Sequence, residues 1–236
     1  ISTKDVVGTT GGSSVPKVIQ PGNETCTVLN IKLEPARFKE GGYDVLLNVE
    51  GPEMGDDFEG FWIDKDNQAK GRHKGKVGRI RASEYPYADG TTKTGVEVSR
   101  DKELLRFLQS FCKETHTLEW FTAQDNKHAT IESLFEAYNN DKPFAGKELR
   151  MCVAGKEYVN KEGYTNYDLF LPKYSRGQVP FESANVDEVS SKVVSFDEQV
   201  HVRKRKVENV SSFGDSKPAA PASSGTAARV QIERTG

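Results

Sequence analysis

Positive charge is concentrated in one short segment of the chain, residues 65–81. This segment carries seven lysines and arginines but a single acid, so its local charge is +6 in a chain whose formal net charge is −2. Its basic residues are Lys65, Lys70, Arg72, Lys74, Lys76, Arg79 and Arg81. Lysine and arginine neutralise phosphates and release the counterions bound to them, so a polyanion is the expected ligand of this segment.

Aromatic residues flank the basic segment on both sides. Trp62 precedes it, and Tyr85 and Tyr87 follow it. Aromatic rings stack on unpaired bases, and each stack contributes roughly 1–3 kcal/mol whatever the base. The combination of cations and rings therefore predicts a surface that binds single-stranded nucleic acid. The alternative is a solvated basic loop, with Phe61 and Trp62 packed in the core.

A second group of the same composition lies in a predicted hairpin, residues 147–171. It contributes Arg150, Lys156, Tyr158, Lys161 and Tyr164. In small barrels that bind oligonucleotides, the loop between the last two strands is one of two main binding loops. We therefore expect these side chains to guide a single strand and to stack on its bases. The alternative for Tyr164 or Tyr167 is packing against the barrel, with the hydroxyl in water.

Signals for catalysis are weak. Residues 71–77 resemble a phosphate-binding loop, but they have three residues between the glycines where four are needed, and Val77 where Ser or Thr must hold magnesium. The four histidines share no spacing typical of a zinc site. We expect no metal, no cofactor and no enzymatic activity. A metal-dependent nuclease is a weaker alternative, because clustered carboxylates can hold two metal ions; the cluster is Asp56, Asp57, Glu59 and Asp64.

Hydrophobic periodicity predicts the elements that must position these residues. Alternating apolar residues predict strands at 24–34, 43–49, 58–63, 147–154 and 164–171, and a weaker alternation at 76–82 either extends the sheet or re-enters it. The first of these strands has an irregularity near Leu29 and Asn30. Residues 65–75 are polar and glycine-rich, which predicts a loop. Apolar spacings of three and four predict one helix that begins after Ser99, its expected N-cap with Glu103 near N3, and another at about 130–140.

The order of these elements indicates the fold class. Three strands, a helical segment and two further strands are typical of the OB-fold, a partly open five-stranded barrel. We predict a mainly β (α+β) domain at residues 17–175, an OB-fold-like five-stranded barrel with a helical insertion between strands 3 and 4. Residues 1–16 are expected to be a flexible segment, and residues 176–236 a mostly disordered tail with a basic run at 203–206.

Composition limits the remaining classes of function. The chain has 236 residues, 35% hydrophobic and 29% charged, with a mean hydropathy of −0.65. Its balanced charge excludes a histone-like polycation. No stretch approaches 18 apolar residues, so we expect no membrane-spanning helix and no membrane partner. Three widely spaced cysteines favour a reducing cytoplasm over a disulfide scaffold.

Two stretches of the chain resemble a known family, the phage-encoded single-stranded DNA-binding proteins with an OB-fold. Their closing hairpin is similar to residues 146–173, GKELRMCVAGKEYVNKEGYTNYDLFLPK. Their basic region, most of all in crAss-like Bacteroides phages, is similar to residues 71–92, GRHKGKVGRIRASEYPYADGTT. The resemblance covers roughly residues 17–175. It implies coating of transient single strands in phage DNA replication or recombination, in the cytoplasm of the bacterial host, with replication proteins as possible further partners.

The expected function is therefore non-catalytic, sequence-independent binding of single-stranded DNA. The expected contact residues are Trp62, Lys70, Arg72, Lys74, Lys76, Arg79, Arg81, Tyr85, Tyr87, Arg150, Lys156, Tyr158, Lys161 and Tyr164. The alternative from a different class is a structural or accessory phage protein whose barrel binds a protein partner. In that case the basic segment would meet an acidic surface of the partner.

Overall fold

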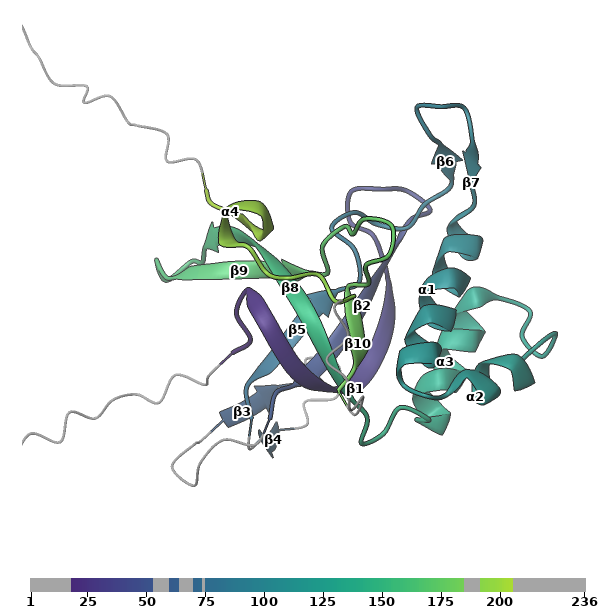
Figure 1. Cartoon of the computed structure of the whole chain (residues 1–236), viewed down its shortest axis with the longest axis horizontal. Helices are drawn as coiled ribbons and strands as arrows, with labels where there is room; N and C mark the ends of the chain where they lie inside the picture. The colour runs from purple at the N-terminus through teal and green to yellow at the C-terminus, as the bar shows by residue number, and fades with distance from the viewer. Residues whose placement is uncertain (1–17, 53–59, 64–69, 74, 185–191, 206–236) are drawn as a thin grey trace, which may run out of the picture. The chain divides into compact units, whose positions relative to one another are not determined.

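The computed structural model describes residues 18–52, 60–63, 70–73, 75–184 and 192–205. These residues belong to one compact unit that extends through Arg205. They form a mixed seven-stranded sheet, two small two-stranded sheets and four helices (Figure 1). The predicted class, mainly β with helices, is confirmed. No helix among the described residues is both long and apolar enough to cross a membrane.

The main sheet is organised around its longest strand, β1 (Gly22–Pro35). Through its C-terminal part β1 pairs antiparallel with β2 (Tyr43–Glu50), and through its N-terminal part it pairs antiparallel with β8 (Glu148–Val159). β2 pairs in turn with β5 (Val77–Arg81). β5 lies parallel to β9 (Thr165–Phe170), and β9 forms an antiparallel hairpin with β8.

β1 changes its partner near its middle. Thr27 is in register with β8 on one side and with the end of β2 on the other. The register against β2 shifts between Val28 and Asn30, which confirms the predicted irregularity. A bulge bends a strand and increases its twist, so it lets one continuous strand serve two neighbours that run in different directions.

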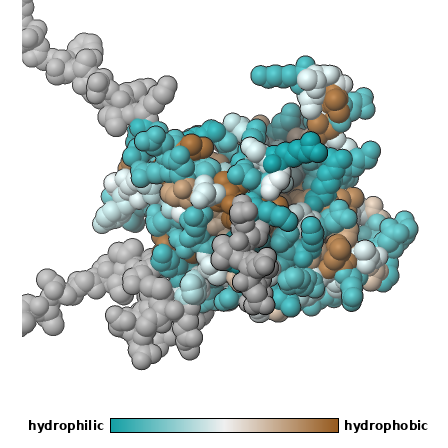
Figure 2. Space-filling view, viewed as in Figure 1, coloured by the Kyte–Doolittle hydropathy of each residue, from teal (hydrophilic) through white to brown (hydrophobic). Residues whose placement is uncertain are grey.

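One face of these strands forms the core. Ile31, Leu47, Ile80 and Leu169 lie opposite one another across four strands, and all four are buried. Because side chains alternate along a strand, the residues beside Ile80 in the chain point to the outer face. The hydrophobic pattern of β5 thus decides that its two arginines face outward. The surface visible in Figure 2 is mostly hydrophilic, with hydrophobic residues in small separate patches.

Three helices lie together at one side of the sheet: α1 (Arg100–Glu114), α2 (Leu118–Ala123) and α3 (Ile131–Asp141) (Figure 1). α1 and α3 confirm the two predicted helices. α2 has only six residues, too few to show a helical period in the sequence.

The caps show where the two long helices begin. Ser99 holds the N-cap position of α1 in an extended conformation, as predicted, but its side chain makes no capping hydrogen bond. Asp101 and Glu103 in the first turn favour this helix end through the helix dipole. At α3 the cap is complete, because the Thr130 side chain accepts a hydrogen bond from the Ser133 backbone N–H.

An aromatic cluster joins the helices to the sheet. The Phe111 ring of α1 lies 6.1 Å from Tyr138 of α3 and 5.7 Å from Phe181, measured between ring centroids. Tyr138 also lies 5.1 Å from Phe144. All four rings are buried and belong to the same core as the strands. The helical insertion and the sheet therefore fold as one unit.

Part of the predicted loop 65–75 is a strand. Residues Lys70–His73 form β4, which pairs antiparallel with β3 (Gly60–Ile63) in a separate two-stranded sheet. The expectation of an uninterrupted loop is wrong here, because pairing with the apolar strand β3 outweighs the loop preference of glycine and charge. A second small hairpin forms where no strand was expected, from β6 (Gly90–Thr91) and β7 (Glu97–Val98).

The structure continues past residue 175, where the domain was expected to end. β10 (Phe181–Ser183) pairs antiparallel with β8. After the short helix α4 (Glu198–His201), β11 (Val202–Arg203) pairs parallel with β8. These residues add two strands to the main sheet, so they are part of the domain rather than of a tail. The predicted flexible segment 1–16 and the stretch 206–236 lie outside the described residues.

Candidate functional site

A groove between β5 and the β8–β9 hairpin collects several of the predicted contact residues; we call it the hairpin groove. Its volume is about 620 Å³. Arg79, Lys156 and Tyr158 line it, together with Tyr167 and Asp168. The groove exists because β5 and β9 are in register only at their C-terminal ends, Ile80 with Leu169 and Arg81 with Phe170. Toward their N-terminal ends the two strands are not paired with each other.

The first described residues of the chain lie in this gap. Val18 forms a parallel bridge with Val77, and the Ile19 backbone N–H donates to the Val77 carbonyl at 2.9 Å. Ile19 is buried against Gly78, where an added Cβ would lie only 2.7 Å from the Ile19 Cβ. The glycine thus permits a close approach that no other residue type allows. The segment seals one wall of the groove.

Replacing Gly78 by alanine should destabilise this wall. The new methyl group would collide with the branched part of Ile19 and displace the segment, at a cost of about 1–3 kcal/mol in the free energy of unfolding. Gly22→Ala is the matched control, because nothing lies within 4 Å of its added Cβ. Urea unfolding of both variants measures the difference, and equal stabilities would contradict this packing.

The β8–β9 hairpin presents two rings to solvent. Tyr158 is 46% exposed on β8, and Tyr164 is 67% exposed beside the tip. The tip is fixed locally, because the Asn160 side-chain oxygen accepts hydrogen bonds from the Glu162 and Tyr164 backbone N–H groups at 3.0 and 2.8 Å. Gly163 completes the turn with a φ of 87°. For Tyr164 and Tyr167 the alternative to base stacking was packing against the barrel. Tyr167 is half-buried against the core, whereas Tyr164 is exposed.

Four of the predicted cations are already in ion pairs. Arg79 pairs with Glu34, and Arg81 pairs with Asp168 at 2.6 Å. Lys76 lies 3.7 Å from Glu24, and Arg150 lies 3.8 Å from Glu182. Lys156 and Lys161, by contrast, are exposed and form no ion pair within the described part of the chain. Among the predicted cations whose side chains are described, those available to a phosphate are therefore Lys156 and Lys161.

The two tyrosines after the basic segment have different surroundings. Tyr85 is exposed, with the Lys173 ammonium 5.2 Å from its ring centroid. Tyr87 packs against the core beside Phe107, with ring centroids 6.3 Å apart, and burial raises the pKa of its hydroxyl. The Tyr87 ring is therefore less available for stacking on a base than the Tyr85 ring. Both residues follow the C-terminal end of β5, whereas the hairpin groove lies at its N-terminal end.

The other predicted contact residues lie on the short strands β3 and β4 or outside the described residues. Trp62 is in β3, and Lys70 and Arg72 are in β4; their side chains, like all of Lys74, lie outside the described residues. So do the carboxylates of the nuclease alternative, at 56–59 and 64. In the basic run, Arg203 pairs with Glu84, and Lys204 lies 3.0 Å from Glu198.

Two exposed rings, Phe38 and Tyr174, were not among the predicted contact residues. Phe38 is 100% exposed in the turn between β1 and β2. Arg37 and Lys39 flank it in the chain, and both are exposed. The signal in the sequence was this Arg-Phe-Lys triplet just before the turn at Gly41 and Gly42.

Comparison of the chain with protein-family models, with curated proteins and with solved structures gave no match.

Proposed function

We propose that the main sheet is an OB-fold barrel. The support is its pairing pattern: β1 pairs with both β2 and β8, so the strands β1, β2, β5, β9 and β8 can close on one another. The helices α1 to α3 lie in the chain between the third and fourth of these strands, β5 and β8. The insertion was predicted at this point, but with residues 58–63 as the third strand; these residues contribute β3 to a separate two-stranded sheet, and β5 takes their place. OB-folds bind oligonucleotides on the face of strands 2 and 3 and on adjoining loops.

On this barrel we propose non-catalytic, sequence-independent binding of single-stranded DNA. The observation that carries the proposal is the hairpin groove, where exposed Tyr158 and Lys156 stand beside a gap between strands and Tyr164 and Lys161 stand at its tip. The lysines hold phosphates, and the rings stack on bases of any sequence. A role in phage DNA replication or recombination is the biological setting that fits such binding.

Fluorescence anisotropy of labelled oligothymidine tests this function directly. We expect binding to the single strand and not to a duplex of the same length, with affinity falling as salt rises. For single strands the log–log slope against salt is about −0.7 per phosphate contact. The protein-binding alternative predicts no binding to either oligonucleotide at low salt, and that result would move the search to acidic protein partners.

A further inference from the structure

A second group of exposed rings lies at the opposite end of β5 from the hairpin groove. Three loops meet there, residues 36–42, 82–89 and 171–178, which we call the far-end loops. Each presents one exposed ring: Phe38, Tyr85 and Tyr174 respectively. Exposed aromatic rings are costly in water, and three at one end of a sheet are an unusual concentration.

Backbone and side-chain contacts between the loops show that they are neighbours. The backbones of Tyr43 and Tyr87 exchange two hydrogen bonds of 2.8 Å, which ties the first loop to the second. The Leu171 N–H donates to the Arg81 carbonyl at 2.8 Å, which ties the third loop to the end of β5. Burial raises the pKa of the Tyr87 hydroxyl, and the charge of Tyr174 adds to this effect. Lys173 also lies over the Tyr85 ring.

The base of the first loop is held rigidly. An Arg100 guanidinium nitrogen donates to the Gly41 carbonyl at 3.0 Å, and the same guanidinium lies 4.9 Å from the centroid of the Tyr43 ring. Phe38 therefore projects from an anchored turn. A turn whose backbone is held before binding loses little conformational entropy when a base stacks on its ring.

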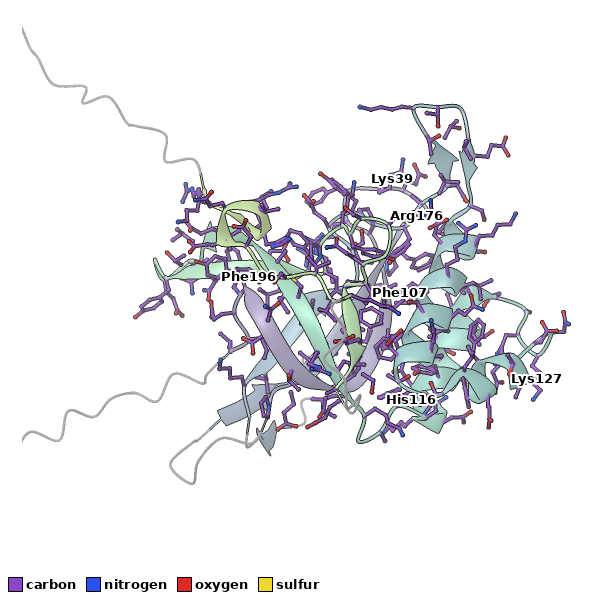
Figure 3. All side chains as sticks on the ribbon, viewed as in Figure 1. Lys39, Phe107, His116, Lys127, Arg176 and Phe196 are labelled. Carbon is purple, nitrogen blue, oxygen red and sulfur yellow. The ribbon has the colours of Figure 1, made fainter. Side chains whose placement is uncertain are left out.

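Charge at this end is positive and available. Arg37, Lys39, Lys173 and Arg176 are all exposed, and none forms an ion pair within the described residues. Figure 3 labels Lys39 and Arg176 on these loops. Three acids lie on the same loops: Glu84 pairs with Arg203, Asp89 accepts a hydrogen bond from the Arg100 backbone N–H, and Glu40 is exposed. Cations without carboxylate partners gain the most binding free energy from contact with a phosphate.

We propose that the far-end loops are a second contact surface for the same single strand, which leaves the hairpin groove, follows β5 and stacks on Phe38, Tyr85 and Tyr174. This inference rests on the proposed function. β5 spans five residues, so the two surfaces are separated by about 13 Å along the strand direction. A short oligonucleotide can occupy only one of them, whereas a longer one can reach both.

Oligonucleotide length is therefore the variable that tests the proposal. Anisotropy titrations would use oligothymidines of about 6 and about 20 nucleotides, within and beyond the usual site size of one OB-fold. The variant Phe38→Ala/Tyr174→Ala should bind the long strand at least roughly tenfold more weakly than the wild type and leave the affinity for the short strand unchanged. Tyr158→Ala, in the hairpin groove, should weaken binding of both lengths.

Two double variants, each of which removes two positive charges, provide a matched comparison. Lys39→Ala/Arg176→Ala should reduce the salt slope for the long strand by about 1.4, two contacts at 0.7 each. Lys102→Ala/Lys127→Ala removes the same charge from exposed positions on the helical side, where Figure 3 labels Lys127, and should leave the slope unchanged.

The outcomes separate this inference from the proposed function. If the far-end variants bind the long strand as the wild type does while Tyr158→Ala weakens it, the second surface is wrong and the function stands. If the far-end variants lost the same affinity for the short and the long strand, a separate second surface would also be wrong. The far-end loops would then belong to the same binding surface as the hairpin groove. If the wild type binds neither strand, the proposed function itself fails, and this inference with it.

Discussion

Replacing Phe181 by alanine is expected to lower the free energy of unfolding by about 3–5 kcal/mol. Phe181 is 1% exposed, and its ring centroid lies 5.7 Å from Phe111 and 6.2 Å from Phe107. Removing the ring leaves a cavity where β10, the helix α1 and the sheet meet. The residue lies beyond position 175, so the loss would show that the domain needs this later segment.

Urea unfolding followed by circular dichroism measures the loss. Tyr174→Ala is the control: it removes a ring of similar size seven residues earlier, but the ring is exposed, and the change should stay within about 0.5 kcal/mol. If Phe181→Ala does not fold, Phe181→Leu keeps most of the volume and should cost about 1–2 kcal/mol. A Phe181→Ala protein as stable as the control would mean that residues 179–184 are not part of the core.

The strands and helices that the sequence predicts correctly are those with a local signal. Alternation of buried residues such as Leu47 and Ile80 is visible within one strand, and so is the helical spacing of Leu104, Leu108 and Phe111. β10 and β11 have three and two residues and exist because they pair with β8. No periodicity can appear in so few residues, so their partner, distant in the chain, decides their structure.

The candidate site was predictable to the same extent. Tyr158 and Tyr164 flank a tip whose turn residues, Asn160 and Gly163, are evident in the sequence. The ion pairs are not: Arg79 pairs with a residue 45 positions away and Arg81 with one 87 positions away. Only the register of β5 against its neighbours brings these carboxylates to the arginines. The density of positive charge in residues 65–81 therefore overstated the charge that is available to a ligand.

Replacing Lys156, Tyr158 and Lys161 together by alanine is expected to weaken binding of oligothymidine by about 100-fold or more. One stacking ring and two phosphate contacts are lost at the hairpin groove. These side chains are exposed, and neither lysine has a carboxylate partner within the described residues. Their removal should therefore leave the free energy of unfolding nearly unchanged. Anisotropy titrations across a salt series measure the affinity and its slope.

The double variant Arg79→Ala/Arg81→Ala is the matched comparison for the two lysines, because Lys156→Ala/Lys161→Ala removes the same charge. The lysine variant should reduce the salt slope by about 1.4, two contacts at 0.7 each. The arginine variant should change it less, since a phosphate would replace the carboxylates of Glu34 and Asp168 rather than free counterions. A larger slope change for the arginine variant would indicate that the oligonucleotide lies over the outer face of β5. The ion pairs of Arg79 and Arg81 would then have to open when it binds. If both variants kept the wild-type salt slope, none of the four cations would contact a phosphate.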